Sequence, residues 1–228
     1  MHKKLNLVTV CTDAYPMVYA NKLHHQFQKL SNLDVTHFCI TDRPLELSEE
    51  ITAITPFISS NGWWNKINVY SSEMPNGIIL YMDLDIVMIQ NFDTEIIAMS
   101  QSEKPMSCVS DAVSWMGERF SSSLMCFESG KHAHIFDRFK KLERVIVGRE
   151  GGDQVWTGPQ LHSINYIDEA FPNLKKNLKF DLAKKNTKNQ LEIPHEIDAR
   201  IKLVDCGGRP KPHELEMLPY IKNNWHLV

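Results

Sequence analysis

Two aspartates interrupt one long apolar stretch of this chain. Residues 78–89 read IILYMDLDIVMI, and Asp83 and Asp85 are the only charged side chains among them. A turn signal, Pro-Asn-Gly at residues 75–77, comes just before this stretch, so the run predicts a strand that is buried on both faces. Strands of this kind are typical of sheets covered by helices. The stretch is therefore predicted to supply the central strand of an α/β fold.

The two carboxylates are predicted to meet at one site. Residues two apart on an extended chain point the same way, and like charges in a poorly solvated place repel each other unless something neutralises them. Carboxylate oxygens suit Mg²⁺ or Mn²⁺, and these ions keep coordination positions for the phosphate oxygens of a substrate. The residues leave one alternative open, in which Asp83 and Asp85 only mark the solvent-facing end of a strand.

The first forty residues also predict an α/β fold. Residues 5–11 read as a strand, a helix follows and ends near Leu30, and residues 35–40 read as a second strand. The apolar side chains of this helix fall on one stripe. His24 and His25 lie mostly off that stripe and are predicted to be exposed.

The rest of the chain predicts shorter elements with weaker patterns. Residues 44–64 lack a clear period and read as an irregular connection. Helices are predicted over residues 65–72, over residues 132–142 and from residue 153, and strands over residues 106–110, 124–127, 164–167 and 201–204. In the helix over residues 132–142, the side chains predicted to face inward are Ile135, Phe139 and Leu142.

Composition favours an ordinary globular protein. The chain has 228 residues, of which 43% are hydrophobic and 23% charged, so one domain over residues 1–228 is predicted. Twenty-five basic residues against 28 acidic ones give a formal net charge of −3. Such a charge offers no general field for a polyanion, which argues against nucleic-acid binding.

One basic window departs from this balance. Six lysines lie between Lys175 and Lys188, against a single acid, Asp181. A solvated loop is the favoured interpretation, and docking to an anionic membrane surface that carries a lipid-linked acceptor is the alternative.

The cysteines and the N-terminus indicate a cytoplasmic protein, peripheral at the inner membrane face if the basic window docks. The five cysteines are scattered, form no C-x-x-C pair and mostly sit in apolar runs, so they are predicted to be buried in a reducing compartment. The N-terminal apolar stretch is too short for a signal peptide and reads as the first strand. No apolar stretch of 18 residues occurs, so a membrane-spanning segment is not expected.

The paired aspartates lie in a segment that resembles a known family. Tyr81–Met88, followed by Asn91-Phe92-Asp93, is similar to the D-x-D segment of the GT-A nucleotide-sugar glycosyltransferases, especially the glycogenin-like and lipopolysaccharide-galactosyltransferase group, family eight. The resemblance implies a Rossmann-like GT-A fold, a mixed central sheet flanked by helices. It also implies that Asp83 touches the ribose and the metal and that Asp85 binds the metal directly.

The first strand and its exit carry a second similarity. Residues 8–15, VTVCTDAY, resemble the nucleotide-binding opening of the family, at a strand carboxyl end where open α/β sheets bind ligands. By this resemblance four side chains would surround the base of the donor: Thr9, Thr12, Asp13 and Tyr15. The alternative is an ordinary strand-to-helix turn with Asp13 near the helix start.

Two further segments match on the way to the C-terminus. Trp64–Ile67 resembles the part of the family that places a lysine upstream of the D-x-D, which implies that Lys66 reaches the donor diphosphate, although a solvated lysine is the alternative. Phe120–Phe127 is similar to the family's N-S/A-G-V segment, which lines the donor-sugar and acceptor cleft. It departs from that segment by lacking the Asn and the Gly.

The pair Asp153 and Gln154 gives the candidate catalytic residues. Residues 151–156, GGDQVW, resemble the D-Q helix start of the family, in which the Asp binds donor or acceptor hydroxyls and the amide lies close to the anomeric carbon. The alternative is structural, because Asp is a preferred residue at the start of a helix.

The last similarity completes the implied metal site. Residues 204–213, VDCGGRPKPH, resemble the H-x-x-G-x-x-K-P loop of the family, with Gly208 and Lys211 at the donor diphosphate. This alignment puts Asp205 where the family has its metal-binding His. A carboxylate also ligates Mn²⁺ or Mg²⁺, so Asp205 is the predicted third ligand, with His213 and His226 as the other candidates.

The resemblance as a whole implies a metal-dependent glycosyltransferase that takes a nucleotide-diphosphate sugar, with UDP as the usual leaving group and retention of configuration. The acceptor, a carbohydrate, a lipid-linked sugar or a protein, stays open. Two alternatives also stay open: a metal-dependent nucleotidyltransferase, and a nucleotide-sugar-binding protein without turnover. The sequence lacks G-x-G-x-x-G, G-x-x-x-x-G-K, G-x-S-x-G and H-E-x-x-H, which argues against dinucleotide, P-loop, serine-hydrolase and zincin sites.

Overall fold

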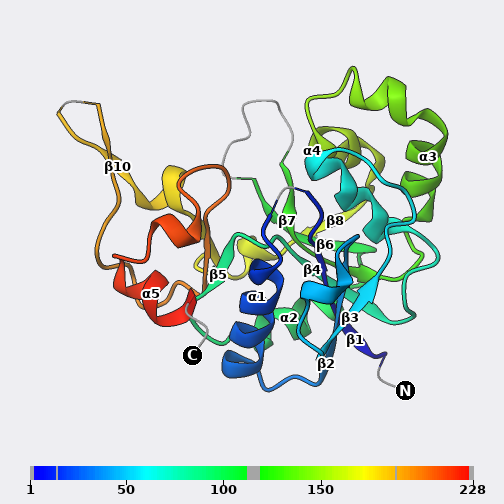
Figure 1. Cartoon of the computed structure of the whole chain (residues 1–228). Coiled ribbons are helices and arrows are strands. Elements are labelled where there is room, and N and C mark those ends of the chain that lie inside the picture. The colour runs from blue at the N-terminus through cyan, green and yellow to red at the C-terminus, as the bar shows by residue number, and fades with distance from the viewer. Residues whose placement is uncertain (1–2, 14, 112–118, 188, 226–228) are drawn as a thin grey trace.

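A seven-stranded mixed sheet forms the centre of the protein (Figure 1). A computed structural model describes residues 3–13, 15–111, 119–187 and 189–225. The strand order is β3-β2-β1-β4-β7-β6-β8, and the strands are β1 Leu5–Val10, β2 Val35–Ile40, β3 Ile51–Ile54, β4 Ile78–Met82, β6 Met106–Ser110, β7 Phe120–Glu128 and β8 Ile164–Tyr166. Strands β3, β2, β1 and β4 are parallel, whereas β7 runs antiparallel to both β4 and β6. The predicted α/β class and the predicted central strand are confirmed.

Alternate side chains of the central strands enter two separate cores. On β4, Leu80 and Met82 pack into one core and Ile79 and Tyr81 into the other, as strand geometry requires. Helices α1 (Val18–Leu30), α2 (Asp93–Ser100) and α5 (Pro219–Trp225) pack in the first core, and η2 (Gly62–Tyr70) and α3 (Ala133–Val147) in the second. Helix α5 lies beside α1 in Figure 1.

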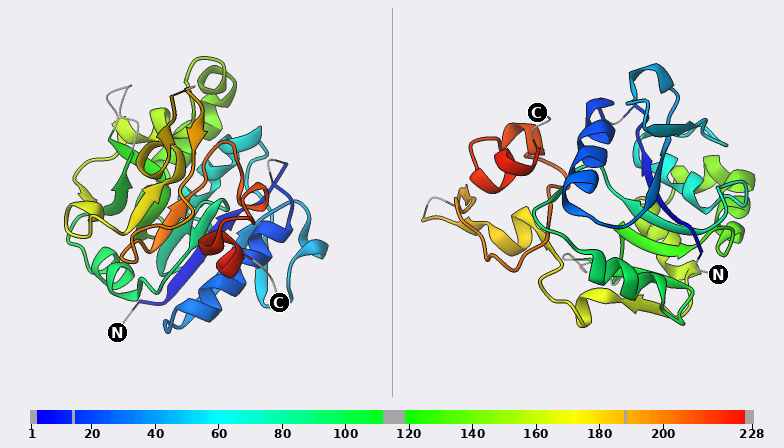
Figure 2. Two further views of the ribbon diagram at one scale, coloured as in Figure 1. Left: turned by 90° about the vertical axis from the view of Figure 1, so that its left-hand side faces the viewer. Right: turned by 90° about the horizontal axis from the view of Figure 1, so that it is seen from below.

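A second sheet joins three segments that are far apart in the sequence. Strand β12 (Leu203–Asp205) pairs antiparallel with β5 (Ile86–Met88) and parallel with β9 (Lys175–Asn177). The hairpin of β10 (Lys184–Lys185) and β11 (Leu191–Glu192) projects from this part of the molecule (Figures 1 and 2). The other short elements of the described residues are η1 Pro44–Glu46, α4 Asp153–Thr157, η4 Gly158–Gln160, η5 Ile167–Glu169, η6 Leu178–Leu182 and η7 Pro212–Glu214.

The structure corrects several local predictions. The connection predicted to be irregular contains β3, which pairs parallel with β2 at the edge of the sheet. Strand β7 starts four residues earlier than predicted and includes three buried serines. Leu142 is 44% exposed rather than inward-facing.

His24 is buried, not exposed as predicted, because it stacks on His37 and its ring contacts Glu50. All five cysteines are free and buried, which confirms their predicted burial. Among the described residues, no helix combines the length and the hydropathy needed to cross a bilayer.

We expect His37 to make folding sensitive to acid. Its ring is fully buried between Thr9 and His24, and burial followed by repulsion from His24 lowers the pKa of His37 from 6.5 to about 3. The unfolded chain therefore binds a proton that the native state rejects, so stability falls as pH drops below about 6.5. Between pH 7 and pH 5, protonation of this group in the unfolded chain is expected to lower the free energy of unfolding by about 2 kcal/mol.

Urea unfolding of the wild type and of His37→Gln at both pH values measures this effect. Over this interval, the free energy of unfolding of the variant is expected to fall by about 2 kcal/mol less than that of the wild type. The control, His25→Gln on the half-exposed neighbour in α1, is expected to keep the wild-type pH dependence. Equal pH dependence in His37→Gln and the wild type would contradict the assignment.

Candidate functional site

Most of the predicted site residues gather at the carboxyl end of the parallel strands. Thr12 follows β1 and Asp83 follows β4, and the antiparallel β7 brings its first residues to the same edge. The amide of Asp83 donates a hydrogen bond to the carbonyl oxygen of Ser123 at 2.8 Å. Helix α4 begins nearby with Asp153, whose side chain bonds to Ser122. This edge is where open α/β sheets bind their ligands.

The chain turns between the two aspartates of the D-x-D segment. The amide of Ile86 donates to the carbonyl oxygen of Asp83 at 3.2 Å, and β5 then leaves for the second sheet. The prediction that Asp83 and Asp85 project from one extended strand is therefore wrong. Both residues still lie in the same turn between β4 and β5, and the charge of Asp83 contributes to raising the pKa of Asp85.

Lys66 holds one half of the site together. Its ammonium lies 2.9 Å from Oδ1 of Asp83, 2.9 Å from Oγ of Ser122 and 3.6 Å from Oδ2 of Asp153. Burial alone would lower the pKa of Lys66, but the carboxylates of Asp153 and Asp83 raise it above its usual value. Lys66 is therefore a charged, nearly buried residue, and the solvated alternative is wrong.

Asp153 and Gln154 point toward β7 rather than capping their own helix. No side chain in the described part of the chain caps α4, whereas the Ser122 hydroxyl donates to Oδ2 of Asp153 at 2.9 Å. Gln154 accepts a hydrogen bond from the Ser122 amide at 3.1 Å and donates to Asp111 at 2.5 Å. The purely structural interpretation of Asp153 as a helix cap does not fit these contacts.

Asp85 lies in the other half of the site, between Tyr15 and Lys211. Its Oδ2 accepts hydrogen bonds from the Tyr15 hydroxyl at 2.8 Å and from the Lys211 ammonium at 2.6 Å. Burial, and then repulsion from Asp83, raise the pKa of Asp85 even though Lys211 opposes the shift. Burial and the nearby carboxylates likewise raise the pKa of Tyr15 well above its usual range, so Tyr15 keeps its proton.

Asp205 forms a third buried ion pair, with Lys175. The Lys175 ammonium lies 2.6 Å from Oδ2 of Asp205 and 2.9 Å from Oγ of Ser123, and both charged side chains are less than 10% exposed. Burial would raise the pKa of Asp205, but Lys175 and a hydrogen bond from the Gly207 amide lower it below its usual value.

The other predicted site residues divide into two groups. Thr12 and Asp13 lie at this edge: Asn65 donates to the Thr12 hydroxyl at 3.0 Å, and the Thr12 hydroxyl donates to Asp13 at 3.1 Å. Thr9 is fully buried and its hydroxyl bonds to His37, so the structure does not bring it to the site surface.

The C-terminal loop places its glycine beside another lysine. Gly208 has a φ of +78°, a backbone conformation that favours glycine, and a Cβ there would collide with the Lys179 ammonium. His213, one candidate metal ligand, instead bonds to the Tyr19 hydroxyl. His226, the other, lies outside the described residues.

Sequence reasoning missed several contributors to the site. Lys175 opens the lysine-rich window that was interpreted as a solvated loop or a membrane contact, yet its side chain is 7% exposed and lies in the site. Arg43 donates to the carbonyl oxygens of Thr12 and Tyr15 and so fixes the loop after β1. No local pattern marks either residue, because both reach the site through the pairing of distant strands.

The predicted metal ligands do not form one cation site in this arrangement. Asp83, Asp85 and Asp205 are each bonded to a different lysine, and among the described residues no three carboxylate, His or Cys side chains converge so that they could hold a metal ion. The residues present therefore do not fit a three-ligand metal centre, and the metal requirement stays a prediction.

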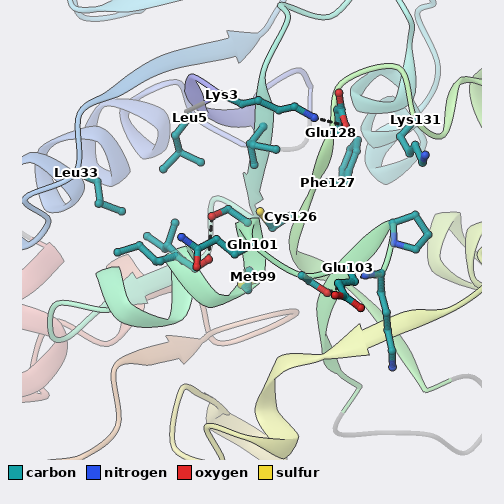
Figure 3. A pocket seen from close by; sticks show the side chains of 17 residues that line it. Lys3, Leu5, Leu33, Met99, Gln101, Glu103, Cys126, Phe127, Glu128 and Lys131 are labelled. Carbon is teal, nitrogen blue, oxygen red and sulfur yellow. Dashed lines mark hydrogen bonds and ion pairs between the residues drawn. The ribbon is translucent and has the colours of Figure 1, made fainter. Parts of the chain in front are cut away.

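A cavity of about 740 Å³ lies at the opposite edge of the sheet (Figure 3). It is lined by Leu5 and Ile78, the first residues of β1 and β4, and by Phe127 near the end of β7. The exposed ion pair between Lys3 and Glu128 lies at this cavity. None of the predicted site residues that the structure describes contributes to its lining.

We expect Lys66→Met to destabilise the fold. Without the ammonium, the buried carboxylate of Asp153 and the partly buried carboxylate of Asp83 face each other with no cation between them, and breaking a buried pair costs about 3–5 kcal/mol. Chemical unfolding measures the loss. Lys3→Met, which removes an exposed ion pair, serves as the control and is expected to leave the midpoint almost unchanged. A wild-type midpoint for Lys66→Met would show that the pair contributes little.

Comparison with known proteins finds similarity in structure rather than in sequence. No family model matches the chain, and no curated protein matches it. The galactosyltransferase LgtC, solved with donor and acceptor sugar analogues, is similar with a TM-score of 0.60 at 12% identity, over 98% of this chain and 97% of LgtC. An active-site mutant of LgtC gives a TM-score of 0.63 at 10% identity with the same coverage.

Larger glycosyltransferases contain a similar unit. GlyE from Streptococcus pneumoniae TIGR4 matches with a TM-score of 0.61 at 12% identity, over 92% of this chain and 56% of the GlyE chain. The bifunctional glycosyltransferase WbbM matches at 9% identity over 93% of this chain and 47% of its own. The chain therefore has the GT-A fold of LgtC-type glycosyltransferases, as the sequence predicted.

Proposed function

We propose that this protein transfers a sugar from a nucleotide-diphosphate donor, with a UDP-sugar as the first choice, to an acceptor hydroxyl. The observation that carries the proposal is the convergence of Lys66, Lys211, Asp153 and Gln154 at the ligand-binding edge of a GT-A sheet. Ammonium groups at such a place match the negative charge of a diphosphate.

Each part of the site has a role in this proposal. The loop after β1, with Thr12, Asp13 and Tyr15, faces the nucleoside, while Lys66 and Lys211 face the diphosphate. Gly208 lets the backbone of the C-terminal loop approach the phosphates, because its positive φ suits glycine. Asp153 and Gln154 hold the hydroxyls of the sugar next to β7.

The proposed reaction breaks the bond between the anomeric carbon and the β-phosphate oxygen. The electron pair of that bond stays on the diphosphate, where fixed ammonium groups stabilise the developing charge. The acceptor oxygen bonds to the anomeric carbon, and its proton passes to an oxygen of the released diphosphate. Retention of configuration is part of the proposal. Because the three aspartates do not form one metal centre, no step is assigned to a metal.

We expect the purified protein to release UDP from a UDP-hexose panel offered with a mixture of sugar acceptors. Asp153→Asn is expected to lower the rate about 100-fold, because it removes a charge next to both Lys66 and β7. Coupled detection of UDP measures the rate. Glu103→Gln, an exposed residue at the distant cavity, is the control and is expected to keep wild-type activity.

Other outcomes would point to the alternatives. UDP binding without release of UDP from any donor would identify a nucleotide-sugar-binding protein without turnover. Release of pyrophosphate from a nucleoside triphosphate and a sugar phosphate would identify a nucleotidyltransferase. Wild-type activity of Asp153→Asn would contradict the role given to that residue.

A further inference from the structure

Lysines compensate the acidic charge of the candidate site. Four of the carboxylates there, from Asp83, Asp85, Asp153 and Asp205, are bonded to three lysine ammonium groups. Each predicted metal ligand has its own lysine: Lys66 for Asp83, Lys211 for Asp85 and Lys175 for Asp205.

These pairs remove the physical reason for which a divalent cation was predicted. Closely spaced carboxylates repel each other unless a positive charge lies between them, and the fold supplies that charge on lysines from η2, β9 and the loop after β12. The resemblance implied two lysines at the site, Lys66 and Lys211, and the structure adds a third, Lys175, from the window that was interpreted as a loop.

Lys175 is positioned like a binding residue rather than a surface lysine. It is the first residue of β9, and its side chain is 7% exposed. Its ammonium bonds to Ser123, the neighbour of Ser122, which bonds to Lys66. An ammonium has three N–H donors, and within the described residues Lys175 uses two, on Ser123 and Asp205. One donor is left for a phosphate oxygen.

The neighbouring loop adds further positive charge. The Lys179 ammonium lies against Gly208, where a Cβ would collide with it. Lys211 likewise uses two donors within the described residues, on Tyr15 and Asp85. The glycine loop therefore carries one lysine, Lys211, and has a second, Lys179, against it, and ammonium groups of this kind suit an anion with several oxygens.

We propose that Lys175 is a diphosphate-binding residue and that, together with Lys66 and Lys211, it allows the site to bind a nucleoside diphosphate without a divalent metal ion. The inference rests on the proposed function, since it concerns the donor of that same site. On binding, phosphate oxygens accept hydrogen bonds from the ammonium groups, and Asp205 keeps Lys175 in place. Lys175 then supplies part of the charge that the predicted Mn²⁺ or Mg²⁺ was expected to supply.

Calorimetric titration of UDP into the full chain tests the proposal, once with Mn²⁺ and once with EDTA. The wild type is expected to bind UDP in EDTA, with a Kd within about threefold of the value in Mn²⁺. Lys175→Met is expected to weaken binding in EDTA about tenfold or more, as the loss of a charged hydrogen-bond donor implies. The matched control, Lys184→Met, removes an exposed lysine of the same window and is expected to bind like the wild type.

A double variant separates binding from folding. Lys175→Met alone leaves Asp205 as a buried lone charge, which is destabilising, so Lys175→Met/Asp205→Asn removes both charges at once. Circular dichroism checks that each variant is folded. If Lys175 binds the diphosphate, the double variant still binds UDP weakly in EDTA; if Lys175 serves only to neutralise Asp205, the double variant regains wild-type affinity and the proposal is overturned.

The remaining outcomes distinguish the inference from the proposed function. UDP binding that requires Mn²⁺ and ignores Lys175→Met overturns the inference and leaves the proposed function in place. Absence of binding for UDP, GDP, ADP and CDP under both conditions overturns the proposed function, and the inference with it.

Discussion

The buried pairing of lysines with carboxylates is the interaction on which the rest of the site depends. Charged groups removed from water are stable only when an opposite charge and hydrogen bonds replace their hydration. Asp85 and Asp205 are almost fully buried, so each requires the lysine that it contacts. These contacts join the loop after β1 and the loop after β12 to Asp85.

The second sheet explains how such distant residues meet. Strand β5 follows Asp85 directly, β12 ends at Asp205, and β9 begins with Lys175. Backbone hydrogen bonds between these strands fix the three positions relative to one another, including the bond from the Cys206 amide to the Asp85 carbonyl oxygen. This part of the site is pre-organised, because Asp85, Asp205 and Lys175 lie in or directly beside paired strands.

Local patterns predicted the elements that are defined by burial alone. The apolar run before Asp83 gave the central strand, and the polar residues that interrupt it located the site. The pattern could not predict the turn between Asp83 and Asp85, because that turn depends on the pairing of β5 with β12. The place of Lys175 in the site was missed for the same reason. The residues around it do not show whether it lies on a paired strand or in an exposed loop.

The ion pair between Lys175 and Asp205 also limits how this chain can diverge. Loss of either residue leaves the other as an uncompensated charge inside the protein, whereas loss of both leaves a neutral site. Descendants of this sequence are therefore expected to keep the two residues or to exchange them together. With three such pairs in one place, single substitutions are penalised at six positions, so the charge pattern of the site is expected to change more slowly than the surface around it.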